Sequence, residues 1–454
     1  MTTLIFIYVP FMALYLSLGL WRAYKIKSLD QFFIPKNLFT LPLATAGLVA
    51  TQLGAGIILE TADHTYLYGW YGLIYPLGLS AGLLLLHHKF AEAWHALHLL
   101  STAQIFEKIY KSPLLRTLAA CIFVVSLFGI LCGEAIALKK MFLSASSVGL
   151  YVFVLSWVTL VLYTALGGLQ AVLATDIAQT LLVYGVFSML AIAFIIFDMP
   201  ILPRLTSLLN NISTLPKHVF DTHSVISLFL LPALFAIISQ QLAIYFFHAR
   251  TSKIARQSAI YSTLILTILT FIPILFGIYA RSFEVQHGMN PLIALLEKLF
   301  PEAIVALTLC AITAAVLSVA DSLLCAIAAH ISYDILKFTH SKKTLILIKV
   351  ITCLVGLSAL IGTFYIEKNL LTILFLAYNL TVSTLFVPIM LAFFLPKKYI
   401  SKKAAWASVT TGLVSELFWK YQLLHAHYLL FNLLFATLAY GIIYLAEKKL
   451  GHSL

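Results

Sequence analysis

The chain has 454 residues, of which 62% are hydrophobic and only 10% are charged, and its mean hydropathy is +1.00. No soluble fold is that apolar, and apolar runs of about 20 residues recur along the chain, so we predict an all-α polytopic membrane protein. The net charge of +12 fits basic loops kept on the cytoplasmic side of a membrane better than nucleic-acid binding. The sequence contains no glycine-rich loop of the kind that binds ATP, which argues against ATP-driven transport.

Hydropathy predicts about thirteen membrane spans. The first apolar run has no basic segment before it, so we predict a retained helix and not a cleaved signal. Lys and Arg gather in alternate loops, with the pair Lys139 and Lys140 as the main exception, which places the N-terminus outside and the C-terminus in the cytoplasm. Short tails favour a bacterial inner membrane. The predicted spans are 3–21, 40–62, 69–88, 114–138, 148–167, 173–197, 225–247, 257–280, 303–333, 344–365, 370–395, 404–420 and 427–446.

Glycine interrupts the second span, which reads ATQLGAGIILETADHTYLYG from Ala50 to Gly69. Glycine in mid-span weakens a helix and exposes its backbone to a ligand, as in the discontinuous helices of secondary transporters. The alternative is a glycine face for close helix packing. In the fourth span, Glu134 either faces the same cavity or pairs with Lys139 near the outer interface. The candidate substrate residues are Gln52, Gly54, Gly56, Glu60 and Glu134.

The seventh span carries a second interruption, predicted at Pro232, and ends in the polar run Ser239–Gln241. The two interrupted spans stand five apart in the predicted order, and an odd offset makes them run in opposite directions. This arrangement is what an inverted repeat of five helices plus five helices requires.

Acidic and hydroxyl residues also occur inside apolar segments. The stretch from Thr313 to Asp334 carries Ser318, Asp321 and Ser322 at spacings of three and four, which put them on one helical face. A carboxylate at bilayer depth is costly, so it normally faces a partner, a cavity or an ion. We interpret this segment as a helix that lines a cation site; an Asp that is hydrogen-bonded within the bundle without any ion remains the alternative.

Three motifs resemble the sodium:solute symporter family, which includes proline, pantothenate and sugar symporters. GGLQAVLATDIAQ at Gly167–Gln179 is similar to the family's GG-x-x-AV-x-x-TD-x-x-Q signature. AAVLSVADSLL at Ala314–Leu324, followed by Asp334, resembles its A-A-x-x-S-T-x-D-S-x-L…D pattern, and Ser239–Ala259 is similar to the family's stretch at the inner end of the seventh span. The resemblance covers essentially the whole chain.

The resemblance implies a LeuT-type fold with alternating access around a central substrate site. Residues 1–454 then form a single integral membrane domain. Within it the resemblance implies an accessory helix at 3–21, a first inverted half at 40–197, a second half at 225–395 and two peripheral helices at 404–446.

The resemblance also implies two cation sites. The main sodium site falls on Ala50, Leu53, Ala315 and Ser318, but the adjoining family position, usually Ser or Thr, is Val319. Valine offers no side-chain oxygen to a hard cation, so we expect this site to be weakened or rebuilt. The second site, which some members possess, falls on Asp176, Ser318, Asp321 and Ser322.

We therefore expect a secondary active transporter that couples sodium to a small organic solute, such as an amino acid, a carboxylate, a vitamin or a sugar. Two neighbouring carboxylates can also share a proton, so proton coupling is an alternative through Asp176 and Asp321. Because of Val319, a solute sensor that does not transport stays open as well. No His or Cys recurs at the depth of the acids, so we expect no enzyme. We expect no organic cofactor, and solute and the lipid bilayer but no nucleic acid as partners. Ile244 and Tyr245 stand where many members carry Gln and Arg, which suggests an altered substrate or gate.

Overall fold

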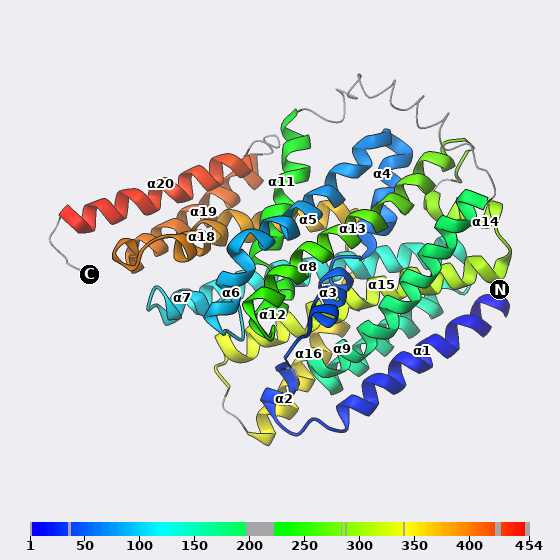
Figure 1. Ribbon diagram of the computed structural model, residues 1–454, viewed down its shortest axis with the longest axis horizontal. Helices are drawn as coiled ribbons and strands as arrows, with labels where there is room; N and C mark the ends of the chain where they lie inside the picture. Colours follow the sequence, from blue (N-terminus) through cyan, green and yellow to red (C-terminus); the bar gives the residue numbers. More distant parts are fainter. Residues whose placement is uncertain are drawn as a thin grey trace.

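The computed structural model describes residues 2–34, 38–196, 222–282, 284–286, 288–338, 341–422 and 428–449. Within these ranges the protein is helical, as Figure 1 shows, and the one β-bridge joins Phe39 to Ala249. The helices are α1 (Thr2–Ala23), α2 (Leu29–Phe33), α3 (Leu41–Ala50), η1 (Gly56–Glu60), α4 (Thr61–Tyr68), η2 (Gly69–Leu73), α5 (Ile74–Leu85), η3 (Leu86–Phe90), α6 (Ala91–Leu97), α7 (Gln104–Lys108), α8 (Pro113–Ala145), α9 (Gly149–Ile196), α11 (Thr222–Ile238), α12 (Gln240–Phe247), α13 (Ser252–Ala280), α14 (Pro291–Leu299), α15 (Glu302–Ala329), η4 (His330–Ile335), α16 (Lys342–Gly362), α17 (Leu370–Thr381), η5 (Val382–Phe386), α18 (Val387–Phe394), η6 (Lys397–Tyr399), α19 (Lys402–Gln422) and α20 (Tyr428–Lys449).

The long apolar helices follow the predicted spans. In the described part of the chain, nine helical stretches are long and apolar enough to cross a membrane, or ten if the bent pair α11 and α12 counts as one span. The spans predicted at 148–167 and 173–197 form one assigned stretch, α9, which contains the non-helical residue Gly168. Helix α19 covers the span predicted at 404–420 but is not among the nine. The polytopic helical class is therefore confirmed, whereas the number thirteen stays a prediction.

Local sequence explains where these helices begin and bend. Helix α8 starts at Pro113, directly after Ser112, whose hydroxyl accepts a hydrogen bond from the Leu115 amide at 3.4 Å. Gly168 has a φ of +51°, and an added Cβ would lie 2.4 Å from the carbonyl oxygen of Phe32. Only glycine fits this turn between the two halves of α9.

Two spans are broken, as predicted. The helix that starts as α3 ends at Ala50 and resumes at Gly56 in the wide turn η1. Helices α11 and α12 meet at Ser239 with a bend of 41°. The predicted position of this second break was wrong, because Pro232 lies inside α11 and packs against Gly78 instead. Proline late in a long helix is tolerated in membranes, where neighbouring helices compensate for the lost hydrogen bond.

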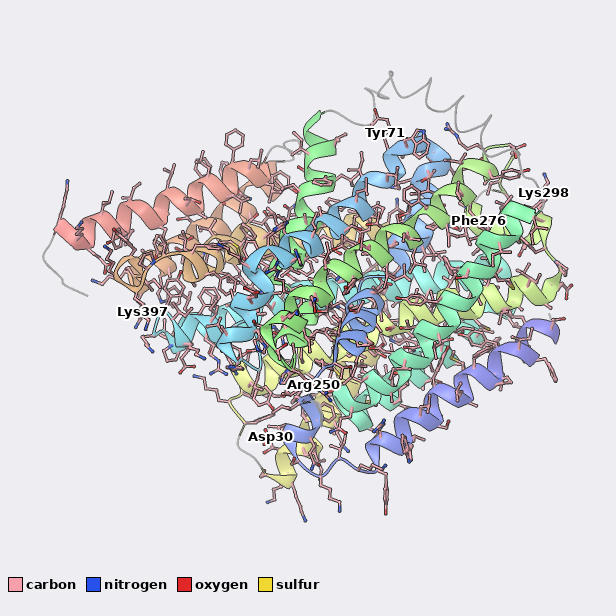
Figure 2. The ribbon with its side chains drawn as sticks, viewed as in Figure 1. Asp30, Tyr71, Arg250, Phe276, Lys298 and Lys397 are labelled. Carbon is pink, nitrogen blue, oxygen red and sulfur yellow. The ribbon has the colours of Figure 1, made fainter. Side chains whose placement is uncertain are left out.

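Burial separates central from peripheral helices. In the most apolar window of α15, 78% of the residues are buried, against 28% in α1 and 22% in α20. Figure 1 shows α1 along one side of the bundle and α19 and α20 on the opposite side, so their exposed apolar faces suit contact with lipid. Figure 2 shows Arg250 and Lys397 toward one end of the bundle and Tyr71 and Lys298 toward the other. This grouping agrees with the predicted loops, while the end that faces the cytoplasm stays a prediction.

Candidate functional site

The break between α3 and η1 lies against the central helix α15. Ahead of the break, the amides of Gln52 and Leu53 both bond to the carbonyl of Val49, at 3.0 and 2.9 Å. The amide of Gly54 turns back to the carbonyl of Gln52 at 2.9 Å, which closes a tight turn before the helix resumes. A helix that stops and restarts leaves backbone groups without their usual helical partners, so this segment is suited to ligand contact.

The structure brings the four predicted main-site residues together. Ala50 and Leu53 from the break and Ala315 and Ser318 from α15 line one cavity of about 10 Å³. That volume is about what a single water molecule needs. Val49, at the end of α3, also lines it, and the other side of the cavity is formed by the second half of α9, through Gln179, Thr180, Val183 and Tyr184.

Polar atoms without partners surround this small cavity. Both side-chain polar atoms of Gln179 and the hydroxyls of Thr180 and Tyr184 have no hydrogen-bond partner among the described residues. Gln179 is 1% exposed and Thr180 is 8% exposed, so water at the protein surface does not satisfy them. Unpaired buried polar groups are costly, so a small hard cation held by these oxygens would offset that cost. Sequence reasoning missed Thr180 and Tyr184 as lining residues, because neither belongs to a recognisable motif.

Val319 does not line this cavity. Its side chain packs at the break, where a Cβ added to Gly54 would lie 2.9 Å from Cγ2 of Val319. Whether Val319 costs the site a ligand stays a prediction; the side chains of α9 that line the cavity carry unpaired oxygens.

The residues of the predicted second site also lie together, one helix turn along α15. The Ser318 hydroxyl donates to Oδ1 of Asp176, and the Tyr163 hydroxyl donates to Oδ2 of Asp321 at 2.7 Å. The hydroxyl of Thr175, the residue before Asp176, also donates to Oδ2 of Asp321 at 3.5 Å. The remaining oxygens, Oδ2 of Asp176 and Oδ1 of Asp321, have no hydrogen-bond partner among the described residues.

Ser322, the fourth predicted member, is buried on the same helix, but no hydrogen bond from its side chain to either acid is seen in the described part. Tyr245 lies beside Asp176, and its ring packs so tightly on Gly47 that an added Cβ there would come within 2.6 Å of the hydroxyl. A tyrosine hydroxyl is thus a neighbour of Asp176.

Glu134 lies at the break and not beside Lys139. Its Oε2 accepts a hydrogen bond from the amide of Ala55 at 3.0 Å, at the start of the resumed helix. Lys139 instead donates to the carbonyl of Thr363 at 2.9 Å. Of the two positions considered for Glu134, the structure therefore shows the one that faces the interrupted span.

The other candidate substrate residues are only partly gathered. Gly54 and Gly56 are buried at the break, and a Cβ on Gly56 would lie 2.8 Å from the hydroxyl of Tyr75. Gln52 is half-buried in the turn. Glu60 is half-buried at the far end of η1, so it does not share the immediate contacts of Glu134.

Comparison with known proteins explains this arrangement. The sodium:solute symporter family model matches residues 32–412. The chain belongs to this family. A solved Na⁺-coupled sialic acid symporter, in a substrate-bound outward-open state, is similar with a TM-score of 0.82 at 18% identity, over 98% of this chain and 97% of that one.

Two more distant structures share the fold. MhsT in complex with L-phenylalanine gives a TM-score of 0.56 at 16% identity, over 90% of this chain and 99% of that one. Mhp1, a nucleobase-cation-symport-1 family transporter in a closed conformation with bromovinylhydantoin bound, gives 0.54 at 13% identity, over 93% and 95% of the two chains. The predicted LeuT-type fold is confirmed, and the predicted family is correct. At these identities the likeness shows the fold alone.

The sequence did not predict an aromatic cluster that lies near the break. The hydroxyls of Tyr75 and Tyr378 lie 3.3 Å apart, and the Tyr378 ring stacks on Phe235 with 4.3 Å between ring centroids. These residues come from α5, α17 and α11, which are far apart in the chain. No local pattern links them, so the sequence held no signal for the cluster.

Proposed function

We propose that the protein is a secondary active transporter that couples the movement of a small organic solute to sodium by alternating access. The observation that carries this proposal is the small cavity where the broken helix, α15 and α9 meet, because all four predicted main-site residues line it. Membership of the sodium:solute symporter family supports sodium as the coupling ion.

We propose that α9 replaces the ligand lost at Val319. Sodium is a hard cation that prefers oxygen ligands, and the unpaired oxygens of Gln179 and Thr180 line the same cavity as Ala315. Backbone carbonyls at the break, Ser318 and these α9 oxygens would then hold the ion. Sodium supplies the driving force when it binds, while the residues of this chain supply the oxygen cage and exclude water.

The two acids Asp176 and Asp321 form a second proposed cation site beside the first. Ser318 belongs to both sets, since it lines the cavity and donates to Asp176. Ion binding at one site would therefore change the hydrogen bonding at the other. Sodium is the favoured occupant of the second site, and a proton shared between the acids is the alternative.

The placement in the membrane and the division of the chain are part of the same proposal. We expect an accessory helix at 3–21, inverted halves at 40–197 and 225–395, and peripheral helices at 404–446. We expect the N-terminus outside and the C-terminus in the cytoplasm, in a bacterial inner membrane. Cysteine labelling from either side of a vesicle, at exposed positions at the two ends of the bundle such as Lys397 and Lys298, would test the orientation.

The first test is thermal melting of the purified full-length protein in sodium and in potassium, at two pH values. A ligand that binds only the folded state raises the melting temperature by mass action, so the proposal expects a rise with sodium that saturates. A melting temperature that changes with pH but not with sodium would indicate that the proton, and not sodium, is the coupling ion. Uptake into proteoliposomes under a sodium gradient separates transport from sensing, because a sensor would bind solute without accumulating it.

A further inference from the structure

Glu134 occupies a particular place at the broken helix. Glu134 is 3% exposed. Its carboxylate accepts a hydrogen bond from the amide of Ala55, the residue before η1. In transporters with discontinuous helices, the positive N-terminal end of the second half-helix is where an anionic group of the substrate binds. In this chain a carboxylate of the protein already holds that position, so a second carboxylate from a solute would meet repulsion there.

Glu134 also lacks a cationic partner. Among the residues that the structure describes, no Lys, Arg or His side chain forms an ion pair with it. The basic residue next along its own helix, Lys139, is bound to the carbonyl of Thr363 and lies over the ring of Phe364. A buried carboxylate at membrane depth without a cation is costly unless a ligand supplies the positive charge.

Aromatic rings approach the break beside Glu134. A Cβ added to Gly56 would lie 2.8 Å from the hydroxyl of Tyr75, which is itself 3.3 Å from that of Tyr378. Both tyrosines interact electrostatically with Glu134, and Phe235 stacks on Tyr378. Aromatic faces attract organic cations, and a carboxylate combined with such rings is a setting that favours an ammonium group.

We infer that the solute is a cationic amine that carries no carboxylate, held by Glu134 with the aromatic cluster of Tyr75, Tyr378 and Phe235. This inference rests on the proposed function and names its substrate class. Glu134 does not line the cavity assigned to sodium, so the amine and the coupling ion have separate places.

The experiment uses matched pairs of solutes that differ in the carboxylate. Ethanolamine is compared with glycine, and choline with glycine betaine, by thermal melting of the full-length protein in sodium. We expect the two cations, ethanolamine and choline, to raise the melting temperature and the two zwitterions, glycine and glycine betaine, to leave it unchanged. We expect Glu134→Gln to raise the apparent dissociation constant of the amines at least roughly tenfold, the usual effect of losing a charge-assisted contact, and to keep the sodium-dependent shift. The control is Glu92→Gln, because Glu92 is a partly exposed acid whose side chain approaches Arg256 and not the break.

A second measurement needs no solute. If Glu134 is a buried charge without a cationic partner in the solute-free protein, Glu134→Gln removes that uncompensated charge. The melting temperature of the solute-free protein then rises by a few degrees. A variant that melts at or below the wild-type temperature would identify Glu134 as a structural cap of the break and overturn the inference. Stabilisation by glycine or betaine, or amine binding that ignores Glu134→Gln, would overturn it as well. Failure of sodium to shift the wild-type protein counts against the proposed function and not against this inference.

Discussion

Two buried acids on one continuous helical segment have opposite surroundings. Asp334, in η4, accepts from Nε of Arg116 at 2.7 Å and from the Ser101 hydroxyl at 2.8 Å, and its other oxygen lies 2.9 Å from Nδ1 of His330. Asp321, in α15, forms no ion pair among the described residues; its donors are neutral, such as the Tyr163 hydroxyl, and one of its oxygens has no hydrogen-bond partner there. Both side chains are fully buried.

The difference separates a structural acid from the acid that we propose binds a cation. The Asp334 cluster ties η4 to α8, because Arg116 also bonds to Glu107 and to the carbonyl of Tyr333. A buried charge that is paired with an arginine and held by further donors is locked in place. An acid with only neutral donors keeps the capacity to bind a cation, which suits the proposed role of Asp321.

The largest effect is expected at the structural acid. Asp334→Asn leaves Arg116 and its neighbours without the charge that they surround, which should lower the free energy of unfolding by about 3–5 kcal/mol. Melting in detergent measures this loss. Glu107 pairs with the same arginine, but its side chain is 40% exposed. Glu107→Gln should therefore lower the free energy of unfolding by less than about 1 kcal/mol. Equal losses in the two variants would contradict the assignment of Asp334 as the anchor.

At Asp321 we expect the reverse pattern, with function lost and stability kept. Asn retains an acceptor for the Tyr163 hydroxyl, so the melting temperature in potassium should hold or rise. Sodium-driven uptake should fall roughly 10- to 100-fold, the usual effect of removing one charged ligand. Exposed Glu367→Gln serves as the control. Unchanged ion-driven uptake in Asp321→Asn would show that coupling does not run through this acid.

The sequence could predict the elements but not the partners of these acids. Periodicity placed Ser318 and Asp321 on one face, and the glycines at 54 and 56 marked the broken helix, because both are local signals. Proline was a weaker marker, since Pro232 is tolerated inside α11 and the bend falls at Ser239. Hydrophobic composition alone was enough for the helical membrane class.

Contacts between distant segments were beyond the sequence. Asp334 stands in the family pattern beside Asp321, and only the fold shows that Arg116, 218 positions away, neutralises it. The bond from Ala55 to Glu134 spans 79 positions, and that of Tyr75 to Tyr378 spans 303. Such pairs depend on helix packing, which a single sequence does not encode in any local pattern.

A smaller effect should distinguish two unpaired hydroxyls on α9. Thr180→Val removes an oxygen that lines the proposed sodium cavity, so the sodium affinity should weaken roughly 3- to 10-fold, while melting in potassium is unchanged because no existing hydrogen bond is lost. Thr164→Val is a matched control, since that hydroxyl is also buried and unpaired but lies outside the cavity. If both variants weakened sodium binding alike, the effect would come from general packing of α9 and not from a ligand.

The smallest effect is expected at an ion pair that is exposed. Arg256 and Glu92 approach to 3.9 Å with side chains that are 54% and 39% exposed, so water and salt screen their attraction. Glu92→Gln should change the free energy of unfolding by less than about 0.5 kcal/mol and leave sodium-driven uptake intact. Melting at low and high ionic strength checks this. A loss as large as that of Asp334→Asn would mean that charge pairing as such, and not burial together with several donors, is what makes an acid structural in this protein.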